Sequence, residues 1–128
     1  MVEALNHIYY GDEACKSIVL DGWNKLIAFQ ITRLVQFEEN TWSPGVGEEI
    51  CDAYMVFTGA TAITFDPQGF LPNDLVNYIS ATRDEGKTSY RVTASIDCVS
   101  ECGDRQEVVI AFSADGLSLE KYFGTQRP

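Results

Sequence analysis

Four cysteines, a single histidine and nineteen dispersed carboxylates are the residues of this 128-residue chain whose types could do chemistry. Cys98 and Cys102 are spaced C-x3-C, whereas zinc sites usually pair cysteines as C-x2-C or combine them with histidines. His7, the only imidazole, lies far from both in the sequence. Serine–histidine or cysteine–histidine catalysis would therefore depend on an N-terminal arm with little structural signal. We expect no metal site, no cofactor and no catalytic residue.

Catalytic motifs are also missing, because the chain contains no nucleophile elbow, phosphate-binding loop, dinucleotide fingerprint, HExxH helix or calcium loop. The carboxylates most worth following are Asp52 and Asp97, since each falls on the polar face of an expected strand. They would meet if those strands were adjacent, and the alternative is a surface ion pair for each, with Arg91 or Arg33 as partner. We therefore expect a protein that is not an enzyme.

Arg33 interrupts the otherwise apolar face of the strand expected over residues 25–37. A charge on that face marks an ion pair inside the protein, since a buried charge has to be paired, the mouth of a cavity, or the point near Leu34 where the core ends. The sequence leaves all three interpretations open.

The cellular compartment is suggested by what the N-terminus lacks. Its sequence, MVEALNHIYYGDE, has no basic region followed by an apolar block, so we expect no signal peptide. No apolar run approaches the roughly 20 residues that cross a bilayer. We expect a cytoplasmic protein, in which thiols stay reduced. All four cysteines are then free: Cys15, Cys51, Cys98 and Cys102.

Charge gives the strongest functional hint, because the formal net charge is −10, with nineteen acidic against nine basic residues. Such a domain repels nucleic acid, whose phosphates bind Lys and Arg, and it repels anionic membranes. If the charge serves recognition, the partner is a basic protein, since complementary potentials speed association. The alternative is that the charge only keeps the protein soluble.

An acidic loop is expected over residues 38–49, EENTWSPGVGEE, where proline and glycine break any strand. Trp42 stands in its middle, and an aromatic residue on such a loop is typical of recognition surfaces. The alternative is that Trp42 folds back onto the sheet as a lid. Trp23, in the expected hairpin turn after Asp21-Gly22, is either a partner anchor or a core-edge residue. The proposed partner-binding residues are Trp42, Glu38, Glu39, Glu48 and Glu49.

These residues must be positioned by a framework that the sequence predicts to be mostly β-strands. In KLIAFQITRLVQF, residues 25–37, apolar side chains recur at every second position, which is typical of a half-buried strand. We expect it at the centre of an antiparallel sheet, with five residues facing the core: Ile27, Phe29, Ile31, Val35 and Phe37. Further strands are expected over residues 15–20, 50–58, 60–65, 89–99, 106–112 and 117–123.

One helix is expected near residues 73–82. Asn73 or Asp74 could cap it, and one helical face would carry Leu75, Tyr78, Ile79 and Thr82. The fold class is therefore mainly β (α+β): an antiparallel sandwich or curled sheet of six to eight strands with one packed helix. Residues 1–128 form a single domain, with a short helix or loosely packed arm over 1–13 and a frayed tail over 124–128.

A resemblance adds to this interpretation. The stretch MVFTGATAITF, residues 55–65, and the later segments YRVTASID and EVVIAFSADGLSLE resemble a pattern in small bacterial β-rich proteins of unknown function, some described as toxin-immunity proteins. In that group a strand, a glycine bend and a second strand precede further sheet strands. The resemblance implies a bacterial, non-enzymatic protein and brings no catalytic motif.

Three functions therefore compete. The first is a small binding or inhibitory module that docks a basic protein, with an immunity-like inhibitor as one version. The second is a structural or assembly protein that associates through a sheet face or edge. The third is a small-molecule binder with a cavity between sheet and helix.

Overall fold

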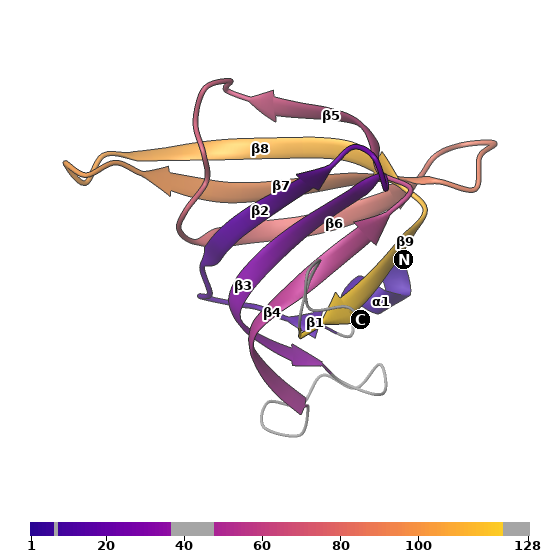
Figure 1. Cartoon of the computed structure of the whole chain (residues 1–128), viewed down its shortest axis with the longest axis horizontal. Coiled ribbons are helices and arrows are strands. Elements are labelled where there is room, and N and C mark those ends of the chain that lie inside the picture. Colours follow the sequence, from indigo (N-terminus) through magenta and orange to yellow (C-terminus); the bar gives the residue numbers. More distant parts are fainter. Residues whose placement is uncertain (7, 37–47, 122–128) are drawn as a thin grey trace.

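Two antiparallel sheets make up the part of the chain that the computed structural model describes, residues 1–6, 8–36 and 48–121 (Figure 1). The first sheet has β3 inside, β4 and β9 on one side of it, and β1 and β2 on the other. The second has the order β5-β8-β7-β6. The strands are β1 (Ile8–Tyr9), β2 (Cys15–Asp21), β3 (Leu26–Gln36), β4 (Glu48–Thr58), β5 (Thr61–Asp66), β6 (Val76–Arg83), β7 (Tyr90–Val99), β8 (Arg105–Ala114) and β9 (Gly116–Glu120).

The mainly antiparallel β architecture is confirmed, and β3 is the long central strand that its alternating residues predict. Ile27, Phe29 and Ile31 are buried as expected. After Ile31 the pattern changes phase, because Leu34 is buried and Val35 only half-buried. Phe37 lies outside the described residues.

The change of phase in β3 coincides with a backbone irregularity in its neighbour. Ile31 pairs with Ala53 and Arg33 with Cys51, so Asp52 lies opposite the point of change. Asp52 has a φ of 56°, which is unusual for a residue other than glycine. Beyond this point Cys51 is exposed, although strict alternation would bury it.

The core lies between the two sheets and is centred on three phenylalanines with no exposed surface. Phe29 of β3 and Phe57 of β4 come from the first sheet, and Phe112 of β8 comes from the second. The ring centroid of Phe57 is 5.9 Å from that of Phe29 and 5.2 Å from that of Phe112, and both pairs are edge-on. This geometry is favourable for aromatic rings, and it joins the sheets at their centre.

The helix predicted near residues 73–82 is wrong, because the segment forms the strand β6 (Val76–Arg83). A register shift between Val76 and Tyr78 inserts an extra residue into the pairing with β7. The two buried residues, Val76 and Ile79, are consequently three positions apart, as they would be on one face of a helix. The bulge therefore imitates helical periodicity.

The expected helix cap has another role. The side chain of Asn73 accepts a hydrogen bond from the backbone N–H of Val99 at 2.8 Å and donates one to its carbonyl at 3.1 Å. These are the bonds that a neighbouring strand would make. Asn73 thus extends the edge of β7 and starts no helix.

The described residues of the N-terminal segment, 1–6 and 8–13, pack against one side of the two sheets. The helix α1 (Val2–Asn6), the only helix among the described residues, contacts β6, and β1 pairs with β3. Ile8 is buried, and the hydroxyl of Tyr10 accepts a hydrogen bond from the backbone N–H of Ile79 at 2.7 Å. This segment closes the sandwich beside β6, whereas the side beside β2 and β5 has no such cover among the described residues.

Candidate functional site

The partner-binding residues predicted from the sequence fall mostly on the segment between β3 and β4. Trp42, Glu38 and Glu39 lie outside the described residues, and Glu48 begins β4 without a described side chain. Glu49 is exposed, and its Oε2 lies 3.5 Å from Nη1 of Arg33. An exposed pair of this kind contributes only about 0–1 kcal/mol, so Glu49 remains accessible to a partner.

The contacts of Arg33 show why a charged residue interrupts the apolar face of β3. Its side chain is 41% exposed, and Nε lies 3.3 Å from Oε2 of Glu13, which is 18% exposed. Because Leu34 beside it is fully buried, the core does not end there. Arg33 instead sits at the sheet surface between two carboxylates.

Asp52 and Asp97 do not meet, because β4 and β7 belong to different sheets. Asp52 is exposed and forms an ion pair with Nζ of Lys16 at 3.1 Å. Asp97 forms an ion pair with Nη1 of Arg105 at 2.6 Å. Ion pairing was the expected alternative, but the partners are neither Arg33 nor Arg91.

A polar network surrounds Asp97, which is 6% exposed on the outer face of the second sheet. Arg105 also contacts Asp74 at 3.0 Å, and Nδ2 of Asn77 donates a hydrogen bond to Asp97 at 2.9 Å. The hydrogen bonds to Asp97 and Asp74 raise the pKa of Arg105. The buried carboxylate is thus fully paired, as stability requires.

The one hydroxyl–carboxylate pair in this network is not placed for catalysis. The Oγ of Ser95 donates a hydrogen bond of 2.5 Å to Oε2 of Glu107. Ser95 has no exposed surface, so a substrate cannot reach its Oγ. The network therefore ties β6, β7 and β8 together and offers no nucleophile.

Metal and thiol chemistry have no support in the described part of the chain. No group of three histidine, cysteine or acidic side chains there could hold a metal ion. All four cysteines are free, and burial raises the pKa of the Cys15 thiol to about 12. A thiol with that pKa stays protonated at neutral pH and is a poor nucleophile.

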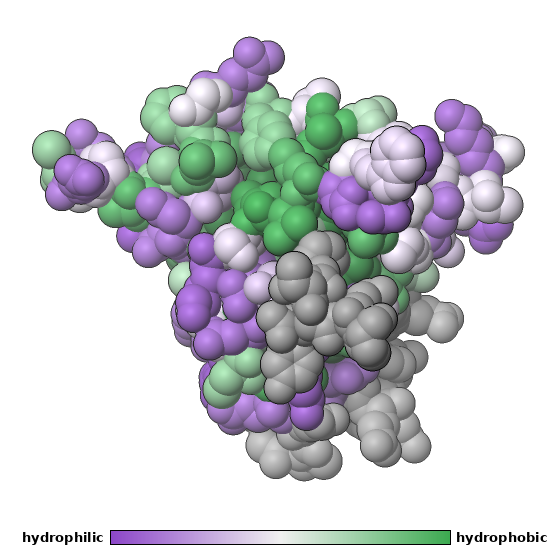
Figure 2. Space-filling view, in the orientation of Figure 1, coloured by the Kyte–Doolittle hydropathy of each residue, from purple (hydrophilic) through white to green (hydrophobic). Residues whose placement is uncertain are grey.

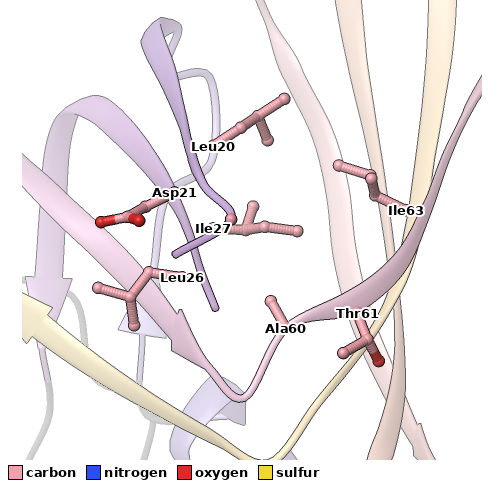
Figure 3. Close-up of a pocket in the computed structure, with 8 residues that line it drawn as sticks. Leu20, Asp21, Leu26, Ile27, Ala60, Thr61 and Ile63 are labelled. Atoms are coloured by element: carbon pink, nitrogen blue, oxygen red, sulfur yellow. The ribbon is translucent and has the colours of Figure 1, made fainter. Parts of the chain in front are cut away.

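The described surface is instead distinguished by an apolar opening between the edges of the two sheets, the β2–β5 groove. Its inner part, of about 100 Å³, lies between the end of β2 and the start of β5. Leu20 and Ile27 point into this gap from the first sheet, and Ile63 points into it from the second (Figure 3). The outer part has a volume of about 560 Å³ and is bordered by Leu20, residues 63–65 and residues 68–71.

Leu20 shows why the groove is open. It pairs with Ile27, and Ile18 pairs with Phe29, so Leu20 lies on the core-facing side of the sheet. Nevertheless Leu20 is 55% exposed. The second sheet ends at β5 and does not reach over the end of β2, which leaves a core-facing position uncovered.

Further apolar side chains continue the groove outward. Phe70 is 42% exposed and Leu71 is 80% exposed, both in the connection from β5 to β6. Figure 2 shows hydrophobic residues gathered on this face over β5 and the gap below it, with hydrophilic residues to either side. A contiguous apolar patch with a polar border is typical of an interaction site.

The rim of the groove carries an exposed aromatic residue and an ordered carboxylate. Trp23, next to the groove residue Gly22, is 94% exposed, which rules out the alternative of a core-edge tryptophan. The carboxylate of Asp21 points away from the gap (Figure 3) and accepts two hydrogen bonds from Asn24, at 2.9 and 3.0 Å. These bonds lower the pKa of Asp21.

Sequence reasoning missed the groove for a physical reason. Leu20 and Ile63 have ordinary strand patterns, and only the relative position of the two sheet edges leaves them uncovered. The one signal available was FLP, residues 70–72, where two large apolar residues precede a proline in a connecting segment.

The comparisons with known proteins add a family without adding a function. No helix among the described residues is long and apolar enough to cross a membrane. Neither the curated proteins nor the solved structures provide a match. A protein-family model does match, and it covers residues 1–127. The chain therefore belongs to DUF6258, a family of unknown function.

Proposed function

We propose that this protein is a small, acidic, non-enzymatic binding module that docks a basic protein through the β2–β5 groove and its surroundings. The observation that carries the proposal is the uncovered apolar groove with Leu20 55%, Leu71 80% and Trp23 94% exposed. An exposed aromatic beside an apolar pocket is the usual anchor of a protein interface. An immunity-like inhibitor of a basic toxin in the bacterial cytoplasm is the most concrete version.

The charge of the protein supports a basic partner. With a net charge of −10, the domain attracts a positively charged protein over long range, while the apolar groove supplies the short-range contact. The same charge makes two copies of the chain repel one another, which disfavours the assembly alternative. The acidic loop with Trp42, Glu38, Glu39, Glu48 and Glu49 belongs to the proposal as a second contact region.

A small apolar molecule is the second candidate, because about 560 Å³ falls within the ~300–1,000 Å³ of typical ligand sites. Such sites usually add a few convergent polar groups that orient the ligand. The outer groove offers Thr64 and Gln68 for this purpose, and no charged side chain among the described residues lines it. A protein partner therefore accounts better for the exposed Trp23 and Leu71.

Affinity capture followed by binding kinetics tests the proposal. The parent protein and the variant Leu71→Glu are used as bait, with Tyr78→Glu as a control, because Tyr78 is a 43% exposed aromatic on β6, outside the groove lining. We expect a basic partner that the control retains, that Leu71→Glu releases faster, and whose association slows with salt. A partner of net negative charge, or equal dissociation from all three baits, would refute the proposal.

A further inference from the structure

We propose that an extended segment of the partner adds as a strand to the free edge of β2 and seats its apolar side chains in the β2–β5 groove. This inference rests on the proposed function and deepens it, because it specifies the binding mode and the chemistry of the bound segment.

The edge of β2 is available for pairing. Among the described residues β3 is the only strand that pairs with β2, and the Cys15 N–H at its start donates to the Asp74 carbonyl at 2.9 Å. Beyond that start, a strand paired on one side leaves every second N–H and C=O group facing outward. From Ser17 to Asp21 its register with β3 is continuous. Apart from the bonds to β3, one backbone group between Ser17 and Asp21 has a hydrogen-bond partner among the described residues. It is the Ser17 carbonyl, which accepts a hydrogen bond from the Cys15 thiol at 3.4 Å.

The edge of β5 across the groove is less suitable. Its pairing with β8 shifts register between Thr61 and Thr64, and Ala62 has a φ of 57°. The Ala62 carbonyl also accepts a hydrogen bond from Nη1 of Arg91 at 3.3 Å. A distorted strand cannot template a regular ladder, so we assign the backbone pairing to β2 and the side-chain contacts to β5.

The edge of β6 on the other side of the sandwich is already occupied. The Val76 N–H donates to the Glu13 carbonyl at 2.9 Å, and the Tyr10 hydroxyl bonds both backbone groups of Ile79. The N-terminal segment therefore covers the edge of β6, whereas no described segment covers β2 from Ser17 to Asp21. The two sides of the fold differ in that respect, and β2 is the edge with an apolar groove beside it.

The groove fixes the chemistry of the incoming strand. Side chains on a strand alternate between two faces, so one face of the segment would meet Leu20, Ile63 and Phe65. No lysine or arginine among the described residues lines the groove, and its one carboxylate, on Asp21, points away from the gap. The inward positions of the segment must therefore be apolar, while its outward positions face a protein of charge −10 and favour lysine or arginine.

A synthetic peptide tests the inference without a known partner. The probe alternates lysine with isoleucine or valine over seven residues, the length of β2, and amide hydrogen exchange is measured on the full protein. At about 100 times its Kd, the peptide should slow exchange of outward-facing amides between Ser17 and Asp21 by up to about 100-fold. Exchange in β5 should change much less.

Two controls separate strand addition from general attraction. A peptide with N-methyl groups on alternate backbone amides keeps its charge and side chains but cannot form the ladder, and it should bind at least about tenfold more weakly. The variant Leu20→Glu should weaken binding of the parent peptide by a similar factor, whereas Tyr78→Glu should not. Leu20 is 55% exposed, so this substitution is compatible with folding, which circular dichroism would verify.

Absence of peptide binding, equal binding of the methylated peptide, or protection in β5 in place of β2 would each overturn the inference. The proposed function fails separately. If a basic partner dissociates faster from Leu71→Glu than from the parent, but the methylated peptide binds as tightly as the parent peptide, the strand addition is wrong and docking through the groove stands.

Discussion

Removing the central phenylalanine of the core should produce the largest loss of stability of any single truncation in β3. Phe29 has no exposed surface, and its ring centroid lies 5.9 Å from that of Phe57 and 6.1 Å from that of Phe112. Truncating a buried phenylalanine to alanine costs about 3–5 kcal/mol, including the cavity that remains. The loss here falls on both sheets, because Phe112 belongs to the second one.

Urea unfolding followed by circular dichroism measures this change. With a urea dependence of about 1.5 kcal/mol per molar, a loss of about 4 kcal/mol lowers the midpoint by roughly 2–3 M. Phe70→Ala is the matched control, because it removes the same ring from a side chain that is 42% exposed, and about 1 kcal/mol is expected for partial burial. Ile31→Ala, at a fully buried neighbour, should cost about 2–5 kcal/mol.

If Phe29→Ala and Phe70→Ala shifted the midpoint equally, the assignment of the core between the two sheets would be wrong. An unchanged midpoint for Ile31→Ala would show that β3 presents its other face to the core.

Three further predictions concern thiols, acid stability and the acidic loop. Cys15, with a pKa of about 12, should resist alkylation in the native protein at pH 8, while the exposed Cys102 reacts. In a separate experiment, rapid alkylation of cells followed by mass spectrometry should find all four thiols reduced. A Cys98–Cys102 bridge would contradict this. Hydrogen bonds from the backbone N–H of Leu75 and then from Arg105 lower the pKa of Asp74 in the folded protein. The charged carboxylate therefore stabilises the fold above its unfolded-state pKa of about 3.9, and this contribution is lost as pH falls through the lower pKa of the folded state. Asp74→Asn should differ from the parent in thermal unfolding at pH 6 but not at the acid limit. Once a basic partner is identified, Trp42→Ala should raise the off-rate of the complex. Charge reversal of the loop acids Glu38, Glu39, Glu48 and Glu49 should lower the on-rate and flatten its salt dependence. Unchanged kinetics in both variants would show that the charge serves solubility alone.

Local pattern was sufficient to predict most of the strands. β3 and β7 each lie between two neighbouring strands, so their side chains point alternately into the core and onto the outer face of the sheet. In β3 up to Ile31, and in β7, this alternation is visible as a period of two in the sequence. Asp21-Gly22 and Gly59 mark connections by turn chemistry, and Gly59 does adopt a positive φ of 63°. These features depend on a few consecutive residues, which is why they could be predicted.

What failed depended on contacts between distant segments. The bulge in β6 shifted buried residues to a helical spacing, and only its pairing with β7 reveals the strand. Asn73 likewise resembles a helix cap by its residue type and position, and only the structure shows that its side chain bonds to the backbone of Val99. The groove could not be predicted because the exposure of Leu20 depends on the position of β5, a strand far along the chain from β2.

The most direct test of the docking module is site-specific photocrosslinking in the living cell. A photoreactive phenylalanine analogue replaces Leu71 at the groove in one strain and Tyr78 on β6 in another. We predict crosslinks from position 71 to a basic protein, little product from position 78, and loss of the position-71 product when Leu20→Glu is added. Equal crosslinking from both positions, or an acidic protein as the product at position 71, would contradict the account.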